Sequence, residues 1–332
     1  MTRRRPTSSD VAREAGVSRT TVSYVLNGVS GQRITEETRA KVLGAAERLG
    51  YTLNAVARTL QRGHSSVVLF ALPPWPLGPP VAEMVSTISR ELSLLGYTPL
   101  VFVEQDTERT NLVRACHEVQ PIGVIAPSSN FQPGILQKVC ASGARAVISY
   151  GEEAVRGAYS LIVSQAAVGA CAIEYLLARG HRDILGVIPT GGELGELGKR
   201  RSAGAREACR AGGSRYRAIA AELHQPALES ALRRTISLRC PEAIFAFNDE
   251  TGFVVIRHLT DWGYRVPEDI AVIGCDDSPA AALFQPSLTS VRFDIGASWT
   301  ALAKLIRQLL SEELVTGSAE WMNTQVVARS SA

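Results

Sequence analysis

The sequence of 332 residues has few cysteines and aromatic residues and contains no long apolar run. Its six cysteines lie far apart, without a CxxC pair or a nearby histidine cluster, so we expect buried, reduced thiols and no metal site. No stretch of about 18 apolar residues is present, which excludes a membrane-spanning helix. The first residues are charged and lack the apolar segment of a secretory signal, so we predict a soluble cytoplasmic protein.

Motifs for catalysis and cofactor binding are also missing. No G-x-S-x-G element occurs, and no histidine has acidic and nucleophilic partners at a catalytic spacing. The glycine-rich stretch 191–198 resembles a phosphate-binding loop, but Arg200 occupies the place of the required serine or threonine. We interpret this stretch as a flexible loop at the mouth of a cleft, leading into a helix. The sequence therefore predicts neither an enzyme nor a bound cofactor.

The N-terminal region has the pattern of two short helices joined by a tight turn. Thr7 and Asp10 have the spacing of a capping box, and Gly16 stands where the turn requires a positive φ. Ser18 can cap the second helix, whose Val22 faces the first helix. This pattern predicts a helix-turn-helix. The outer face of its second helix carries hydrogen-bonding side chains, namely Arg19, Thr20, Thr21, Ser23 and Tyr24.

The alternative is an ordinary helical hairpin whose polar face is only solvated. Three neighbouring features argue against it. Arg3, Arg4 and Arg5 are placed to meet phosphates, and a third helix capped by Thr35 would complete a small core. Residues 1–63 contain eleven Lys and Arg against five Asp and Glu, whereas the rest of the chain is slightly acidic. This charge distribution is typical of a nucleic-acid-binding module joined to a different domain.

From residue 66 onward, short apolar runs alternate with amphipathic stretches of helical period. Nine apolar runs indicate buried strands at residues 67–72, 99–103, 122–126, 146–149, 161–163, 184–188, 243–247, 270–274 and 289–293. The helical stretches between them include residues 81–95, 167–178, 250–262 and 298–310. The alternation predicts parallel sheets with helices on both faces, and nine strands suit two half-domains with a ligand cleft at the carboxyl ends of the strands.

Three blocks near the N-terminus have a characteristic order and spacing. They read DVAREAGVSRTTVSYVLNG, ITEETRAKVLGAAERLGY and NAVARTL. Two further blocks are AIFAFNDETGFVVIRHLTDWGYRVPEDIAVIGCDDSP and PSLTSVRFD. Together these blocks resemble the LacI/GalR (lactose-repressor) family of transcription regulators. The resemblance implies a ligand-responsive repressor.

The resemblance also implies an N-terminal all-α helix-turn-helix DNA-binding domain and an α/β two-lobed periplasmic-binding-protein-like domain. The expected boundaries are residues 1–53 for the headpiece, 54–63 for a hinge helix or linker, and 64–332 for an effector-binding and dimerisation domain. By the same analogy, residues 64–161 and 293–320 would form the first lobe, and residues 162–290 with the strand-like segment 324–328 the second. No leucine heptad follows that segment, so we expect a homodimer rather than a tail-mediated tetramer.

Members of this family bind double-stranded DNA at an inverted-repeat operator, with each recognition helix of a homodimer in a major groove. On this basis we expect Arg19 to contact guanine, and Thr20 and Tyr24 to read further bases. Phosphate contacts are expected from Thr7, Ser18, Thr21, Ser23 and Asn27. The hinge would add Asn54, Ala57, Arg58 and Leu60, of which Leu60 matches the leucine that the family wedges into the minor groove.

A small-molecule effector between the two lobes, a sugar by analogy, is a further implication of the resemblance. Arg201 matches the arginine of the family's R-x-x-G element, which commonly contacts ligand hydroxyls. Asn248 and Asp276 follow predicted strands, where amides and carboxylates suit hydrogen bonds to sugar hydroxyls. Trp75 would either stack on a sugar ring or pack at the edge of a lobe.

The residues around these positions leave alternatives open. Loop or helix capping is the other role for Asp249, Asp276 and Asp277, and Ser164-Gln165 replaces the Asp-Asn pair of many relatives. From the body of the chain alone, a solute-binding protein of a transport system or a sugar- or nucleotide-processing α/β enzyme would also fit. The basic N-terminal region argues against the first, and the missing catalytic constellation argues against the second.

Overall fold

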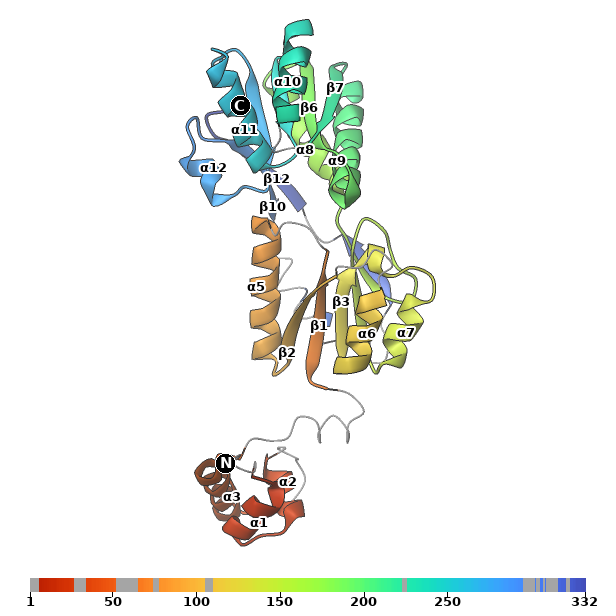
Figure 1. The fold of residues 1–332 in the computed structure, drawn as a ribbon, viewed down its shortest axis with the longest axis vertical. Coiled ribbons are helices and arrows are strands. Elements are labelled where there is room, and N and C mark those ends of the chain that lie inside the picture. The colour runs from red at the N-terminus through yellow and green to blue at the C-terminus, as the bar shows by residue number, and fades with distance from the viewer. Residues whose placement is uncertain are drawn as a thin grey trace. The chain divides into compact units, whose positions relative to one another are not determined.

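The computed structural model describes residues 6–26, 34–51, 65–73, 78–104, 110–222, 226–294, 302, 305–306, 308, 316–320 and 323–332. The chain forms two compact units, Met1–Ser65 and Ser66–Ala332 (Figure 1). Several predicted positions lie outside the described residues, namely Asn27, Asn54, Ala57, Arg58, Leu60 and Trp75. Most of the predicted helix 298–310 does so as well.

The first unit contains three helices around a small apolar core. They are α1 (Ser8–Ala15), α2 (Arg19–Leu26) and α3 (Glu36–Leu49). The predicted capping box is confirmed, because the backbone N–H of Thr7 donates to Asp10 at 2.9 Å and Asp10 N–H donates to the Thr7 hydroxyl at 3.4 Å. Gly16 has the predicted positive φ of 64°. Val11, Val22, Val25, Val42, Ala45 and other apolar residues of the three helices bury one another.

In the second unit, the first lobe is built on a parallel six-stranded sheet of order β11-β5-β4-β3-β1-β2. Its strands are β1 (Val67–Leu72), β2 (Thr98–Val103), β3 (Gly123–Pro127), β4 (Ala146–Gly151), β5 (Tyr159–Ile162) and β11 (Gly317–Glu320). Its helices are α5 (Pro79–Leu94), α6 (Thr110–Val119), the short 3-10 helix η1 (Ser128–Asn130) and α7 (Ile135–Ala141). The central strands are buried, as continuous apolar runs in a parallel sheet predict.

The second lobe repeats this plan with a sheet of order β12-β10-β9-β8-β6-β7, in which only β12 runs antiparallel to its neighbour. Its strands are β6 (Asp183–Pro189), β7 (Arg215–Ala221), β8 (Ala243–Ala246), β9 (Ala271–Cys275), β10 (Thr289–Asp294) and β12 (Asn323–Val327). Its helices are α8 (Gln165–Ala178), α9 (Gly192–Ala211), α10 (Pro226–Leu238), α11 (Asp249–Asp261) and α12 (Pro279–Leu283). The fold class predicted from the sequence is confirmed.

The glycine-rich stretch 191–198 is not the flexible loop that the sequence suggested. Helix α9 begins at Gly192 and includes the rest of the stretch. Gly198 faces the end of β6, where an added Cβ would lie 2.7 Å from Cδ of Pro189. The glycines therefore let the first turns of α9 approach the strand closely, and the prediction of a loop is wrong.

Helices α8 and α9 cross at very short range, and this crossing positions the candidate ligand residues. A Cβ added to Gly204 of α9 would lie 1.9 Å from the carbonyl oxygen of Ala166, and one added to Gly169 of α8 would lie 1.9 Å from that of Arg201. The two glycines allow backbone to meet backbone. Arg201 of α9 is thereby held beside the first turn of α8.

Within the ranges that the structure describes, none of the helices combines the length and the apolar character that are needed to cross a bilayer.

Candidate functional site

Helix α2 presents a polar outer face that is suited to contact another molecule. Ser18 caps the helix by accepting the N–H of Thr21 at 3.0 Å, while Val22 and Val25 anchor it to the core. Arg19 and Thr20 at its first turn are exposed, and among the described residues neither side chain has a hydrogen-bond or ion-pair partner. Thr21, Ser23 and Tyr24 are partly exposed on the same helix. Thr7 and Ser18 cap their helices, and the Thr21 hydroxyl shares a hydrogen bond with that of Ser18 at 2.9 Å, while the phosphate contacts of all three stay predictions.

At the carboxyl ends of the second lobe's strands, Arg201 forms a buried cationic centre. Its side chain is 6% exposed, and its guanidinium stacks over the ring of Phe247 at 4.5 Å. The Nε–H donates to the Gln165 side-chain carbonyl at 2.7 Å, and an Nη–H donates to the backbone carbonyl of Phe247. An Nη atom also lies 3.9 Å from Oδ1 of Asp276. Buried charge is tolerated only with such partners, so the guanidinium is fixed in place.

Asp276 approaches Arg201 from the turn after β9. It adopts a φ of 99° and accepts a hydrogen bond from the Cys275 thiol at 3.5 Å. Burial raises the pKa of Asp276, although the positive charge of Arg201 opposes the rise. The structure therefore brings together Arg201 and Asp276, two of the four predicted ligand residues. Trp75 lies outside the described residues.

The structure gives the helix-capping role that was suggested for Asp249 to its neighbour Asn248. Asn248 is the cap of α11, because its side-chain carbonyl accepts the N–H of Thr251 at 2.9 Å and the Thr251 hydroxyl at 2.6 Å. Asp249 is not a cap: its carboxylate accepts the N–H of Ser278 at 2.6 Å and the hydroxyl of Ser290 at 2.5 Å. The capping role suggested for Asp249 is therefore wrong. The cap uses the side-chain oxygen of Asn248, so a ligand contact by its amide nitrogen stays a prediction.

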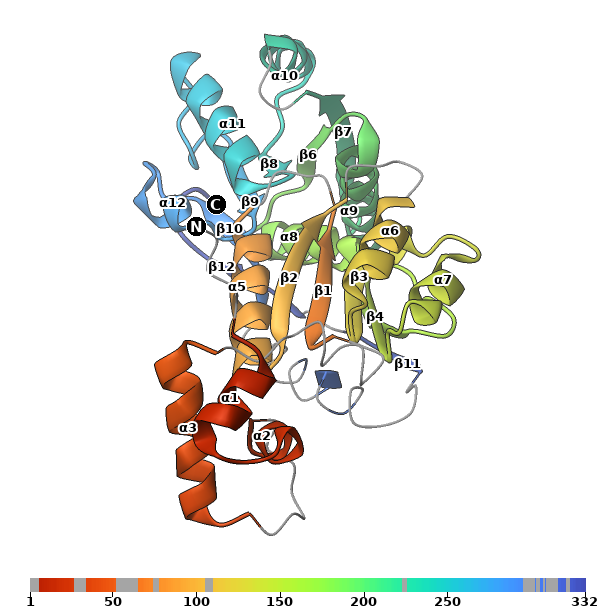
Figure 2. The same ribbon diagram turned by 60° about the horizontal axis from the view of Figure 1, so that its bottom comes forward.

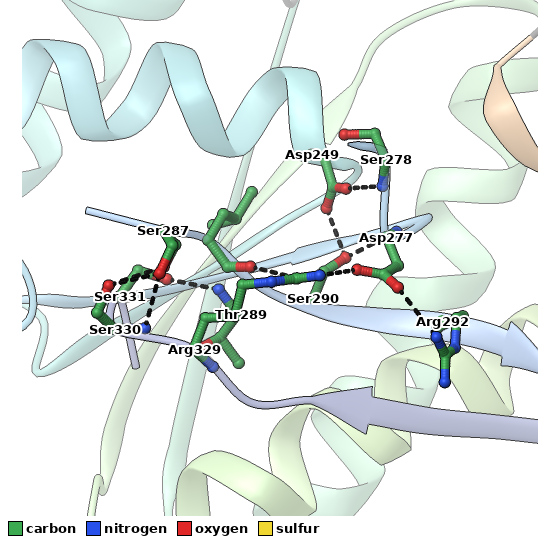
Figure 3. A network of polar contacts seen from close by, with 11 residues as sticks. Asp249, Asp277, Ser278, Ser287, Thr289, Ser290, Arg292, Arg329, Ser330 and Ser331 are labelled. Carbon is green, nitrogen blue, oxygen red and sulfur yellow. Dashed lines mark hydrogen bonds and ion pairs between the residues drawn. The ribbon is translucent and has the colours of Figure 1, made fainter. Parts of the chain in front are cut away.

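Sequence reasoning missed the residues that support this turn. Asp277 pairs with Arg329 at 2.5 Å and with Arg292 at 3.5 Å, and Ser290 links the turn to Asp249 (Figure 3). The only available signal was the position of Asp277 directly after a strand, because the partners lie up to 52 residues away. Gln165, which departs from the family pattern, is the partner of Arg201.

A cavity of about 470 Å³ lies away from this cluster, at the amino ends of β6, β7 and β8. It is lined by Arg182, Asp183, Gly213, Ser214, Arg215, Arg239 and Glu242. Asp183 is surrounded by Arg215, Arg217 and Arg239, so the charges of this cavity are largely paired within the chain. We interpret it as the surface of a structural ion-pair network. No group of three His, Cys, Asp or Glu residues among the described residues could hold a metal ion.

Comparisons with known proteins decide the family. Residues 7–54 match the family of bacterial regulatory proteins, lacI family, and residues 173–332 match the periplasmic binding protein-like domain. The HTH-type transcriptional repressor PurR of Serratia proteamaculans is 31% identical over 311 residues, which cover 86% of this chain and 84% of the relative. The chain belongs to the lacI family. It is a transcriptional regulator of that family, whose named relatives are regulators rather than enzymes.

Solved structures of transcription regulators share the fold of the whole chain. A complex of the transcriptional regulator CelR with cellobiose has 26% identity and a TM-score of 0.65, with 99% of this chain and 100% of that chain covered. The Lac repressor dimer bound to operator and the anti-inducer ONPF has 23% identity and a TM-score of 0.79, with 99% of each chain covered. The predicted two-domain architecture of this LacI-family chain is therefore confirmed.

The carboxyl group of Asp249 should make stability depend on pH. Burial raises its pKa to about 6, although hydrogen bonds from Ser290 and Ser278 oppose the rise. Because this folded-state value exceeds the ordinary value of 3.8, folding favours the protonated form. Its contribution to stability is present at low pH and is lost as the pH rises through about 6, with a total on the order of 2–3 kcal/mol.

We therefore expect Asp249→Asn to gain stability relative to the wild type as the pH rises from about 4 to about 7. The asparagine keeps a carbonyl for the Ser278 N–H and an amide for the Ser290 hydroxyl. Urea unfolding at several pH values measures the difference. Asp261→Asn, at a half-exposed position of the same helix, is the control. A constant difference between Asp249→Asn and the wild type across this range would contradict the prediction.

Proposed function

We propose that this LacI-family chain is a ligand-responsive repressor that binds an inverted-repeat operator as a homodimer, with a sugar as effector between its lobes. The observation that carries the proposal is the presence, in one chain, of two complementary sites. One is the helix-turn-helix with the exposed Arg19, and the other is the buried Arg201 with the partly exposed Asp276 beside it, at the strand ends of the second lobe. Binding at the second would change affinity at the first.

The proposed DNA contacts follow from the exposure of α2. Arg19 has a planar fork of donors that fits the O6 and N7 acceptors of guanine in the major groove. Thr20 and Tyr24 lie on the same helix and would read neighbouring base pairs. Thr7, Ser18, Thr21, Ser23 and Asn27 would hold phosphates, which set the register without reading sequence. Asn54, Ala57, Arg58 and Leu60 are proposed for the minor groove.

The homodimer is supported by exposed apolar side chains on one side of the second unit. The edge strand β2 exposes Leu100 and Val101, each by 40%, and the end of α5 exposes Leu94 by 75%. In the other lobe, Leu283 of α12 is 86% exposed. Both views place α5, β2 and α12 on the same side of this unit (Figures 1 and 2). Covering this side with a second copy would remove apolar surface from water and protect the sheet edge.

A sugar effector is supported by the chemistry of the Arg201 cluster. Guanidinium, carboxylate and amide groups, flanked by the ring of Phe247, suit a ligand with several hydroxyls and an apolar ring face. The CelR complex, whose structure resembles this chain, contains cellobiose. Asn248 and Trp75 would complete the contacts of the ligand.

Selection of bound sequences from a random duplex pool at physiological salt tests the DNA-binding part. We expect the full-length protein to recover an inverted repeat, and Arg19→Ala to lose preference at one base pair of each half-site by about tenfold or more. The control is Arg48→Ala, which removes an arginine that pairs with Glu14 instead. Recovery of no shared sequence by the wild type would contradict the operator, and an unchanged preference for Arg19→Ala would contradict its role.

Sedimentation of the full-length protein tests the dimer. Val101→Glu places a charge in the proposed interface and should raise the dimer dissociation constant by about 100-fold, because a desolvated charge is unpaired there. Leu238→Glu is the matched control, since Leu238 is 82% exposed at the end of α10, outside the proposed interface. Equal effects of the two substitutions would argue against an interface at β2.

Thermal unfolding with a panel of sugars, cellobiose among them, tests the effector site. We expect at least one sugar to raise the melting temperature of the wild type and to bind Arg201→Gln about tenfold or more weakly, because buried hydroxyl contacts are lost. Arg200→Gln changes the preceding residue, which is half-exposed and pairs with Glu152, and should leave binding intact. A wild type that recovers an operator but responds to no sugar would refute this class of effector.

A further inference from the structure

The turn that carries Asp276 has a strained backbone. Asp276 and Asp277 are consecutive residues with φ of 99° and 47°, and residues other than glycine rarely adopt such positive values. Such a backbone conformation is unfavourable for residues other than glycine and persists only when the surrounding structure fixes it. Some contact must therefore hold this turn.

Asp277 makes the contact that best fits this role. Its carboxylate is 9% exposed and lies between Arg329, at 2.5 Å, and Arg292, at 3.5 Å. Its N–H donates to the Ser290 hydroxyl at 3.0 Å. Figure 3 shows the Arg329 side chain aimed at this carboxylate from one side and Arg292 from the other. The two cations differ sharply in exposure, with Arg329 at 17% and Arg292 at 49%.

Arg329 is itself fixed at three points. One Nη–H donates to the backbone carbonyl of Leu288 at 2.8 Å, another donates to Asp277, and the backbone N–H donates to the Thr289 hydroxyl at 2.9 Å. The following residues are fixed as well. Ser331 is buried and exchanges hydrogen bonds with the backbone of Val272 in β9. The guanidinium is therefore held in a fixed position beside Asp277, because two of its nitrogens are hydrogen-bonded at the same time.

We propose that Arg329 is a positioning residue for the effector site. Its ion pair with Asp277 holds the turn after β9 in the left-handed conformation that places the Asp276 carboxylate beside Arg201. The proposal rests on the proposed function only in naming this cluster the effector site. Arg329 does not touch a ligand; it fixes the backbone from which Asp276 projects.

The first test is amide hydrogen exchange of the full-length protein without ligand. Arg329→Met should speed exchange at residues 276–278 by about tenfold or more, because the held turn opens locally. The matched control is Arg292→Met, which removes the exposed partner of the same carboxylate and should change exchange by less than about threefold. Equal exchange in the two variants would overturn the proposal.

A second set of variants separates positioning from simple charge pairing. In the Arg329→Met background, Asp277→Gly and Asp277→Ala both remove the carboxylate that has lost its buried partner, but only glycine adopts the positive φ without strain. We expect the glycine variant to restore slow exchange at Asp276 and the alanine variant not to do so. Equal rescue by both would show that Arg329 only neutralises charge, and would overturn the positioning role.

Cellobiose titration of the same variants connects the turn to ligand binding. If the wild type binds cellobiose, Arg329→Met should weaken binding by about tenfold, with recovery in the Asp277→Gly double variant but not in the Asp277→Ala one. Binding unaffected by Arg329→Met would overturn the proposal. A wild type that does not bind cellobiose would count against the proposed effector alone, because the exchange experiment still decides the role of Arg329.

Discussion

The close crossing of α8 and α9 is the constraint on which the second lobe's site depends. Gly169 and Gly204 let the two backbones meet where any side chain would collide with a carbonyl oxygen. At this separation Arg201 reaches both Gln165, at the start of α8, and the carbonyl of Phe247, after β8. A guanidinium buried to this degree is stable only where such acceptors are already in place. Helix packing thus determines where the positive charge of the site lies.

The acidic side of the site depends on a different kind of constraint. Asp249 is buried and Asp276 is 18% exposed, and desolvation raises the pKa of each. Different elements fix their backbones: Asp249 lies at the start of α11, and Asp276 lies in a strained turn. The hydrogen bond that the Ser278 N–H donates to the Asp249 carboxylate joins these two elements. The carboxyl groups are therefore positioned by tertiary contacts rather than by the helix or strand that carries them.

The difference between local constraints and tertiary contacts also explains what could be predicted from the sequence. Strand β1 has the predicted bounds because a buried parallel strand is a continuous apolar run. Strands β7 and β11 were missed because they lie at sheet edges, where exposed positions interrupt the apolar pattern. The stretch 191–198 was misread because glycine suggests a loop, whereas here it serves close packing of a helix on a strand.

Within the candidate site, Arg201 and Asp276 could be found because one lies in a short motif and the other directly follows a strand. Gln165 and Arg329 could not, because their contacts join residues 36 and 52 positions apart in the chain. No local spacing indicates a partner so distant. The crossing of α8 and α9 decides the role of Gln165. The sheet order decides that of Arg329, because it brings β9, β10 and the segment after β12 together.

The hydrogen bonds that the Arg201 guanidinium already makes affect how a ligand would bind. A guanidinium has five N–H donors. Two hydrogen bonds to Gln165 and Phe247 hold the group among the described residues, and Asp276 lies at 3.9 Å, longer than a hydrogen bond. A ligand hydroxyl inserted between Arg201 and Asp276 would accept from the first and donate to the second without displacing either existing bond. Binding would then add contacts to a site already ordered, and its free energy would not be reduced by the cost of arranging the charges.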